Sequence, residues 1–401
     1  MTRRAWAYLA RTVEGPHPAL NRLLGEVGPE EAADRVKRRV GLPGDLAGAT
    51  ESRFHLDHAD EDLATAARHG FRLVTPEDDE WPVDAVQNFL GSTAPGNDAA
   101  PPYALWVRGG RLDVLVDDAV AMVGTRAATS YGARMTERLA AGVARAGATI
   151  ISGGALGIDA VAHRTALDVG GRTIVIAACG PGVDYPAAHA DMFRRIGGSV
   201  DSGDSGDSGE SGQSEKQGAI VTEYPPGIRP ARHRFLTRNR LVAGLAGATV
   251  LVEAGWRSGA RNTAAWARHM NRPVGAVPGP ATSASSTGCH DAIREGEAVL
   301  VTSPEHVLGL YRGVGEVDEA AQMELEWAAD PIQSLGRNEL RVYDATPKTG
   351  GAGRGGGTAG ADTAAIAAEA GMTLPLAMHL LLALESKGLV ERRGSAWRRA
   401  R

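Results

Sequence analysis

The feature that most constrains the fold is a regular alternation of short apolar runs and helical stretches between residues 119 and 277. Such alternation is typical of parallel strands joined by crossover helices. The predicted strands are 119–123, 149–152, 173–178, 219–223, 249–253 and 274–277. The predicted helices are 131–146, 159–169, 186–196, 237–245 and 261–270. The sequence therefore predicts an α/β domain built on a doubly wound parallel sheet.

Smaller elements are expected before this domain. Residues 1–75 carry apolar residues at helical spacing, interrupted by turns such as Gly15-Pro16 and Gly28-Pro29, which predicts a small helical module. Such turns occur in SAM-like or helix-hairpin-helix modules that bind DNA backbone, but a plain helical cap explains them equally well. Residues 76–312 then form the α/β domain, with an edge strand or extended arm near residues 104–107.

The C-terminal part of the sequence predicts a linker and a second domain. Residues 313–361 turn polar and glycine-rich, which is typical of a flexible linker. Residues 362–401 predict two helices and a short β-ribbon, the outline of a winged-helix domain. Its second helix, at 374–386, offers few polar side chains to base edges. Contact with a protein or with DNA backbone is therefore favoured over sequence-specific binding.

An acidic insert interrupts the α/β domain at residues 201–217, with repeated Asp-Ser-Gly units. These residues cannot bury apolar surface, so the insert is expected to be a disordered loop. It contributes to a net charge of −5, which gives no overall signature of nucleic-acid binding. A binding site for a polyanion has to be a local patch.

Cysteine and histidine usage gives no indication of a cofactor. Cys179 and Cys289 lie far apart without CxxC spacing, and the histidines lack the spacing of metal ligands. The N-terminus is too charged for a secretion signal, and no apolar run is long enough to span a bilayer. We expect a cytoplasmic protein without cofactor, metal or membrane contact.

One stretch, residues 223–253, concentrates positive charge. Between Glu223 and Glu253 there is no other acid, and Tyr224 and Phe235 are interleaved with five arginines, namely Arg229, Arg232, Arg234, Arg238 and Arg240. Guanidinium groups bind phosphates with paired hydrogen bonds, and a nearby aromatic ring can stack on a base. Alternatively, the arginines form a solvated face paired with carboxylates. The apolar runs that follow predict that they lie at the edge of the sheet and not on a free helix.

Three predicted strand-to-helix turns also have the composition of phosphate-binding loops. They contain Gly124-Thr125-Arg126, Ser152-Gly153 and Ser258-Gly259. Glycine lets the backbone approach a ligand closely, and amides at a helix N-terminus favour an anion. The alternative is that these glycines only make tight turns. Asp159 and Glu253 are expected to orient the loops, and His163 is expected in the core or at a helix cap.

Several enzyme classes are excluded by missing motifs. The sequence has neither GxGxxG nor GxxxxGK[ST], so neither NAD binding nor a P-loop ATPase is indicated. No Ser/His/Asp or Cys/His set is evident.

The sequence resembles the DNA-processing protein A family, DprA or Smf, from residue 120 to about residue 307. The shared motifs are VGTR at 123–126, SGGALGID at 152–159, EYPPG at 223–227, FLTRNRLVAGL at 235–245, VEAGWRSGARNTA at 252–264 and VPGPATSASSTGCHDAIREG at 277–296. The resemblance implies an extended Rossmann domain that binds single-stranded DNA without sequence preference. It also implies protection of incoming strands during natural transformation and loading of the RecA recombinase, by a binding protein that is not an enzyme. A homodimer is expected.

The resemblance assigns the DNA contacts to the VGTR arginine, the SGG loop and the FLTRNR segment, with Arg232 and Arg234 in place of a basic residue just before it. Two positions depart from the family pattern, since Leu156 replaces a common arginine and Leu236 a common proline. The predicted DNA-binding residues are Gly124, Thr125, Arg126, Ser152, Gly153, Arg232, Arg234, Phe235, Arg238, Asn239, Arg240, Ser258 and Gly259.

A nucleotide-processing enzyme is the alternative. Nucleoside-monophosphate phosphoribohydrolases of the LOG type share a related Rossmann core, and residues 255–262 could be a degenerate form of their phosphate loop. Those enzymes use a glutamate and an arginine around a PGGxGTxxE-like motif, which this sequence lacks. Release of base from AMP-like substrates would distinguish the two hypotheses.

Overall fold

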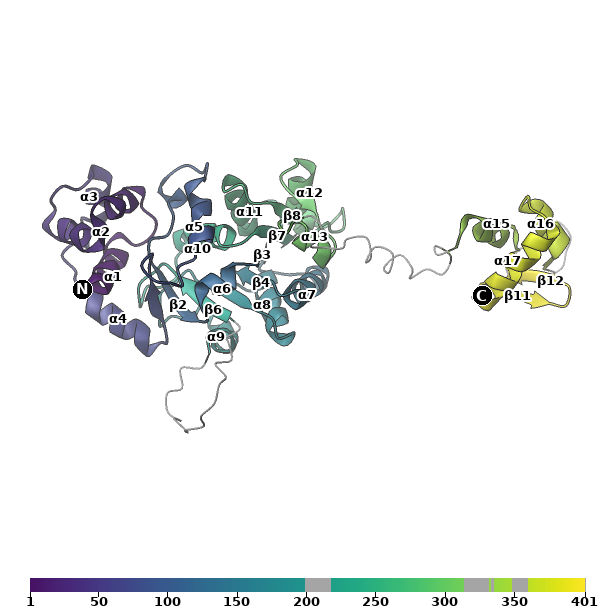
Figure 1. The fold of residues 1–401 in the computed structure, drawn as a ribbon, viewed down its shortest axis with the longest axis horizontal. Coiled ribbons are helices and arrows are strands. Elements are labelled where there is room, and N and C mark those ends of the chain that lie inside the picture. The colour runs from purple at the N-terminus through teal and green to yellow at the C-terminus, as the bar shows by residue number, and fades with distance from the viewer. Residues whose placement is uncertain (199–217, 314–331, 333–334, 348–359, 401) are drawn as a thin grey trace, which may run out of the picture. The chain divides into compact units, whose positions relative to one another are not determined.

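The computed structural model describes residues 1–198, 218–313, 332, 335–347 and 360–400 (Figure 1). The chain divides into two compact units, Met1–Val317 and Asp318–Arg401. The acidic insert at 201–217 and much of the predicted linker at 313–361 lie outside the described residues.

The larger unit is built on a nine-stranded sheet with the order β1-β2-β6-β5-β4-β3-β7-β8-β9. Its strands are β1 (Arg72–Val74), β2 (Leu105–Gly109), β3 (Ala119–Gly124), β4 (Thr149–Ser152), β5 (Thr173–Ile176), β6 (Gly218–Thr222), β7 (Ala248–Glu253), β8 (Val274–Ala276) and β9 (Val299–Leu300). The seven strands from β6 to β9 in this order pair in parallel, whereas β1 and β2 pair antiparallel. The predicted doubly wound parallel sheet is confirmed. Strand β2 is not the edge strand, because β1 pairs with its outer side.

Helices cover both faces of this sheet (Figure 1). They are α5 (Val83–Leu90), α6 (Leu112–Val116), α7 (Ser130–Arg145), α8 (Ile158–Asp168), α9 (Ala190–Gly197), α10 (Arg232–Gly244), α11 (Gly259–His269), α12 (Thr287–Arg294) and α13 (Pro304–Leu308). Alternate residues of β3 enter two different cores. Ala121 packs in the core that contains α10 and α11, and Met122 packs in the core that contains α7 and α8.

Helix α10 begins at Arg232, five residues before the predicted start. Arg232 and Arg234, which the sequence placed before the helix, therefore lie on it together with Arg238 and Arg240. Apolar residues at the end of α10, such as Leu241 and Val242, are buried in the core. The helix is thus fixed against the sheet, and its arginines have defined directions.

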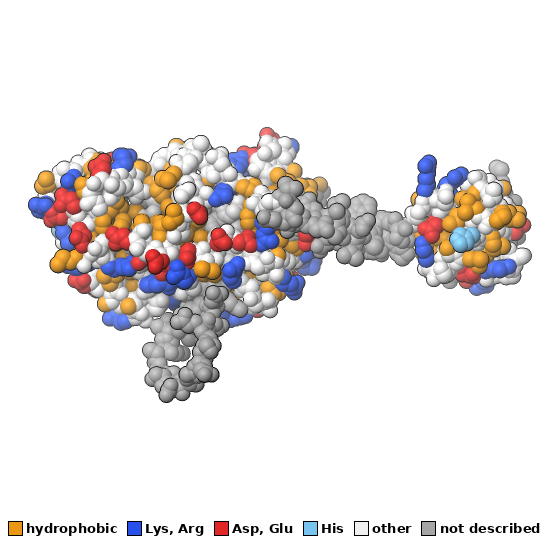
Figure 2. Space-filling view, in the orientation of Figure 1, with side chains coloured by type: hydrophobic (Ala, Val, Ile, Leu, Met, Phe, Trp, Pro, Cys, Tyr) orange, Lys and Arg blue, Asp and Glu red, His pale blue; other side chains and the backbone are white. Residues whose placement is uncertain are grey.

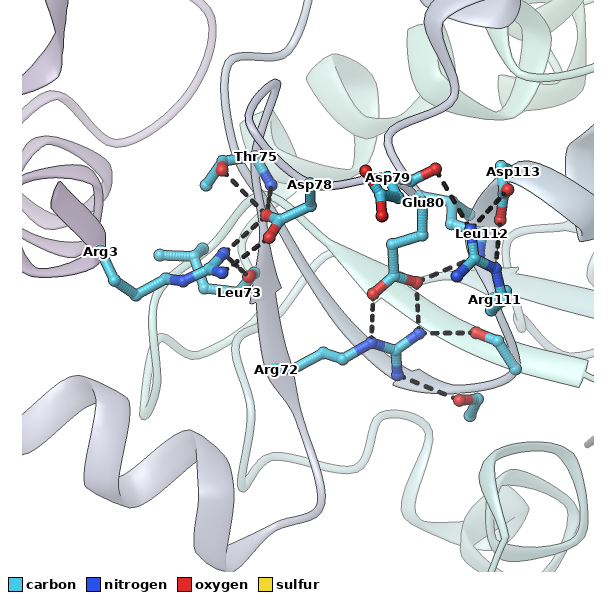
Figure 3. A network of polar contacts seen from close by, with 12 residues as sticks. Arg3, Arg72, Leu73, Thr75, Asp78, Asp79, Glu80, Arg111, Leu112 and Asp113 are labelled. Carbon is cyan, nitrogen blue, oxygen red and sulfur yellow. Dashed lines mark hydrogen bonds and ion pairs between the residues drawn. The ribbon is translucent and has the colours of Figure 1, made fainter. Parts of the chain in front are cut away.

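The predicted N-terminal helices are present as α1 (Thr2–Val13), α2 (Pro18–Arg38), α3 (Gly44–Thr50) and α4 (Ala59–Arg68). They do not form a separate unit, because their apolar residues share one core with Trp106 of β2 and Ile220 of β6. Polar contacts strengthen this attachment (Figure 3): Arg3 pairs with Asp78 at 2.6 Å and donates to the carbonyl of Leu73 in β1. The N-terminal helices thus extend the core of the sheet.

The C-terminal unit contains α15 (Arg337–Ala345), α16 (Thr363–Glu369) and α17 (Leu374–Ser386), with a sheet of order β10-β12-β11. The strands are β10 (Ala361–Asp362), β11 (Val390–Arg393) and β12 (Ala396–Arg399). Helix α15 lies inside the predicted linker, yet Val342 and Tyr343 are buried in the core of this unit. The linker prediction is wrong for these residues.

Helix α17 has an apolar outer side, as its sequence predicts. Leu374, Leu376 and Leu382 are exposed, and Figure 2 shows hydrophobic side chains gathered on the visible face of this unit. Among the described helices, none alone is long and apolar enough to cross a membrane, although α16 and α17 together meet that test across a 104° bend. The winged-helix assignment stays a prediction.

His163 of α8 is fully buried in the structure, which confirms the core position that was expected. Its Nδ1 lies 2.7 Å from the hydroxyl of Thr173, and its Nε2 has no partner among the described residues. Burial lowers the pKa of His163 to about 3. Below pH 6.5 this histidine takes up a proton in the unfolded chain but stays neutral in the folded protein. The free energy of unfolding therefore falls as the pH drops below 6.5.

We expect His163 to make the protein sensitive to mild acid. Between pH 7 and pH 5 its contribution to the free energy of unfolding should fall by about 2 kcal/mol. Denaturant unfolding of the wild type and of His163→Gln at several pH values measures this contribution, because other titrating groups are common to both proteins. The stability difference between the two should shrink toward pH 5, and a constant difference would contradict the assignment.

Candidate nucleic-acid interface

A pocket of about 870 Å³ lies at the carboxyl ends of the central strands. Strand β3 has β4 on one side and β7 on the other, so the strand order reverses there, and ligands of open α/β sheets bind beside such a reversal. Residues from the turns after β3, β4 and β7 line the pocket together with α10. The predicted DNA-binding residues among them are Gly124, Thr125, Arg126, Gly153, Arg232, Phe235, Arg238, Asn239, Ser258 and Gly259.

An aromatic and cationic group lies in the pocket wall. The guanidinium carbon of Arg126 lies 5.3 Å from the ring centroid of Phe235, and the ring of Tyr185 lies 5.5 Å from that of Phe235 at a tilt of 51°. Arg126 and Tyr185 are exposed, and Phe235 is half-buried. These three side chains offer a π-face beside a positive charge. Tyr185 was not predicted, although it belongs to the turn that follows β5 at the same edge of the sheet.

Arg238 provides a buried positive charge at the pocket floor. Its side chain donates to the carbonyl of Ile176, its Nε has no partner, and it makes no ion pair with any described residue. Burial lowers the pKa of Arg238, and the negative charge of Asp159 opposes this effect. A guanidinium group nevertheless stays charged in proteins. Arg238 is therefore a desolvated cation. The negative charge of Asp159 acts on it, but no described carboxylate pairs with it directly.

Gly153 allows the guanidinium of Arg238 to occupy this position. A Cβ atom built on Gly153 would lie 2.1 Å from Nη1 and 2.4 Å from Nη2 of Arg238. Any larger residue at position 153 would displace the cation. The glycine of the SGG motif thus has a packing role that the sequence did not reveal.

Further polar groups line the pocket wall. Arg232 and Arg257 are exposed, and Asn239 donates a 3.1 Å hydrogen bond to Asn262. Arg257 was not predicted, although it lies in the GWRSGA segment between two conspicuous glycines. The pocket therefore combines Arg126, Arg232, Arg238 and Arg257 around one aromatic pair.

Several turn amides that were predicted to hold phosphates are engaged within the protein. The amide of Thr125 donates to the carbonyl of Glu253 at 2.7 Å, and the amides of Gly153 and Ala155 donate to Asp159 at 3.2 and 3.4 Å. The amide of Ser258 donates to Gly255 at 3.1 Å. Guanidinium groups are consequently the main anion-binding groups of this pocket.

Two buried carboxylates hold the turns in place, as the sequence predicted. Glu253 accepts from the amide and hydroxyl of Thr129 at 2.9 and 2.8 Å and from the hydroxyl of Ser285 at 2.6 Å. Burial raises the pKa of Asp159, which binds the loop after β4. Both residues orient loops at the pocket.

Three predicted DNA-binding residues lie outside the pocket and have partners within the fold. Ser152 is buried and donates to the carbonyl of Met122 at 2.6 Å. Arg234 pairs with Glu14 of the segment after α1 at 2.5 Å. Arg240 is fully buried and pairs with Glu223 at 2.5 Å. Each of these side chains has a partner within the fold, and their assignment to DNA contact stays a prediction.

The turn of the helix explains the division among the arginines. At 3.6 residues per turn, Arg232, Phe235 and Asn239 share one face of α10, whereas Arg234 and Arg240 point to other sides.

Among the described residues, no group of three or more His, Cys, Asp or Glu side chains could hold a metal ion.

Comparisons with known proteins identify the family of this chain. The family described as DNA recombination-mediator protein A matches residues 72–201 and 209–312. The putative DNA processing protein DprA of Mycobacterium tuberculosis (strain ATCC 25618 / H37Rv) is 45% identical over 400 residues, which cover 99% of this chain and 94% of that protein. Protein Smf of Escherichia coli (strain K12) is 37% identical over 229 residues, which cover 57% of this chain and 54% of that protein.

A solved structure shows the same relationship. The X-ray structure of DNA processing protein A from Streptococcus pneumoniae matches with a TM-score of 0.57 at 30% identity, covering 74% of this chain and 92% of that chain. The family match spans more than half of the sequence and includes the whole pocket. The chain belongs to the DprA (Smf) family of DNA recombination-mediator proteins.

Proposed function

We propose that the chain binds single-stranded DNA in the pocket at the carboxyl ends of β3, β4 and β7. The observation that carries the proposal is the group of Arg126, Phe235 and Tyr185 above Arg238. Guanidinium groups attract the phosphate backbone, and the aromatic faces stack on bases that are not paired in a duplex. Stacking accepts any base, so the binding is independent of sequence.

The buried charge of Arg238 adds to this argument. A cation that is removed from water without a direct ion pair is costly, and an incoming phosphate would add a direct counter-charge to the indirect one of Asp159. Asn239 and Ser258 line the same pocket and can donate further hydrogen bonds.

The wider role in the cell rests on family membership. We propose that the protein protects single strands and passes them to the RecA recombinase, acts in natural transformation, and works as a homodimer. These steps require a bound strand, so single-strand binding is tested first. The alternative of a LOG-like phosphoribohydrolase has weaker support, because the relatives from Mycobacterium tuberculosis and Streptococcus pneumoniae are described as DNA processing proteins. An assay for base release from AMP would test it directly.

The decisive experiment is fluorescence anisotropy of a labelled oligo-dT and a matched duplex over a salt series. We expect tight binding of the single strand, weaker binding of the duplex, and loss of affinity with rising salt. Equal affinity for both forms, or binding that does not respond to salt, would contradict the proposal.

Two variants should separate charge from stacking in the same assay. Arg232→Ala removes one phosphate contact, so the slope of log affinity against log salt should become shallower by about 0.7. Phe235→Ala should leave that slope unchanged and cost about 1–3 kcal/mol of binding free energy at every salt concentration. His233→Ala, at an exposed position of the same helix outside the pocket lining, is the control. If Phe235→Ala alters only the slope, Phe235 does not stack on a base.

A further inference from the structure

One tryptophan of the larger unit is exposed. Trp256 follows β7 and is 60% exposed. The other tryptophans that the structure describes are between 0% and 8% exposed, and they are Trp6, Trp81, Trp106, Trp266 and Trp397. Burial of an indole side chain is strongly favourable, so a large ring that is held in solvent is a candidate contact for a ligand.

The loop that carries Trp256 is fixed to α12. The amide of Trp256 donates to the hydroxyl of Thr287 at 3.1 Å, and the amide of Gly288 donates to the carbonyl of Ala254 at 2.7 Å. A Cβ atom on Gly288 would lie 2.6 Å from the carbonyl oxygen of Gly255. Loop and helix are therefore in close contact, and the indole is presented from an anchored backbone.

Arg261 supports the indole from one side. Its guanidinium carbon lies 5.1 Å from the centre of the Trp256 ring, and the same group pairs with Asp291 at 2.8 Å. The two carboxylates nearest to Arg261, Asp291 and Glu297, are both engaged with it. Arg261 is thereby fixed against the ring.

Trp256 also lies beside the pocket that binds the strand under the proposed function. The residues on either side of it, Gly255 and Arg257, line that pocket, and so do Ser258 and Gly259. Trp256 itself does not line the pocket, so a strand would reach the indole only beyond Arg257. The chemistry suits this path, because Arg257 can hold a phosphate while a neighbouring ring stacks on its base.

We propose that Trp256 is a second stacking platform, which takes a base of the strand just outside the pocket. The inference rests on the proposed single-strand binding and extends the binding path from Phe235 across the loop after β7. Continuity with the pocket and the adjacent cation of Arg257 favour a nucleic-acid strand over a second protein as the ligand.

Intrinsic fluorescence tests the contact directly. Titration of the full-length wild type with unlabelled oligo-dT should quench emission and reduce the access of iodide, whereas Trp256→Phe should lack most of this change. Anisotropy with dT oligomers of roughly 4 to 20 nucleotides gives the energetic effect. Trp256→Ala should lower the affinity for the longer oligomers by about tenfold and leave the affinity for the shortest oligomers that bind unchanged. Trp256→Phe should restore much of the lost affinity.

The outcomes distinguish this inference from the proposed function. Suppose that the wild type binds single strands and that Phe235→Ala lowers this affinity. If Trp256→Ala then has no effect on affinity or quenching, only the second platform is refuted. If Trp256→Ala instead changes the oligomeric state measured by light scattering and leaves DNA affinity intact, Trp256 is a protein contact and the inference fails. Absence of single-strand binding by the wild type would overturn both.

Discussion

Replacement of Arg238 by alanine is expected to lower the affinity for oligo-dT by about tenfold to a hundredfold. A hydrogen bond to a charged group contributes about 1.5–3 kcal/mol, and each 1.4 kcal/mol corresponds to a tenfold change in affinity. The effect should exceed that of an exposed arginine, because Arg238 is 5% exposed and its field is weakly screened by solvent. Anisotropy at moderate salt measures the loss.

Gly153→Ala offers an independent test of the same site, because it moves the charge without removing it. The added methyl group would overlap Nη1 and Nη2 of Arg238, so the guanidinium has to leave its place against the loop. We expect an affinity loss of the same order as for Arg238→Ala. The double variant should then be little worse than either single variant.

Controls make this prediction specific. Arg229 is exposed and lies outside the pocket lining, so Arg229→Ala should change affinity far less. Circular dichroism of each variant shows whether the fold is retained. Wild-type affinity in both Arg238→Ala and Gly153→Ala would mean that the buried cation is structural and that the strand is bound elsewhere.

The sheet and the position of the pocket could be predicted from the sequence because both follow from local patterns. Apolar runs such as 149–152 mark buried strands, and turns after parallel strands necessarily gather at one edge. The three-residue strand β1 was too short to give such a pattern. The attachment of the N-terminal helices to Trp106 and Ile220 depends on contacts between distant segments, which periodicity does not reveal.

The arginine cluster shows what the sequence alone could not resolve. The sequence alone does not distinguish Arg234, Arg238 and Arg240, and all three were predicted to contact DNA. The start of α10 at Arg232 determines to which side of the helix each arginine points. The fold then shows that Arg234 pairs with Glu14 and that Arg240 pairs with Glu223. Glu14 is too distant in sequence for its pairing with Arg234 to be predicted.

Arg240 and Glu223 form the buried pair whose disruption we expect to cost the most stability. The side chains are 0% and 4% exposed, and the guanidinium also lies 5.3 Å from the ring centre of Phe89. Removing one partner leaves the other charge buried without compensation, which costs about 3–5 kcal/mol. Arg240→Ala or Glu223→Ala should therefore lower the free energy of unfolding of the larger unit by this amount, as measured by denaturant titration.

The matched control separates structure from DNA contact. Arg240→Met combined with Glu223→Leu removes both charges and keeps apolar volume, so it should recover most of the lost stability, since well-packed replacements of buried ion pairs are often neutral. Arg234→Ala, which breaks a partly exposed pair with Glu14, should cost less. Under conditions in which the double variant is folded, its affinity for oligo-dT should match the wild type, because Arg240 has no access to the pocket. A stable double variant that no longer binds would instead make Arg240 a phosphate ligand, and α10 would have to rotate on binding to expose it.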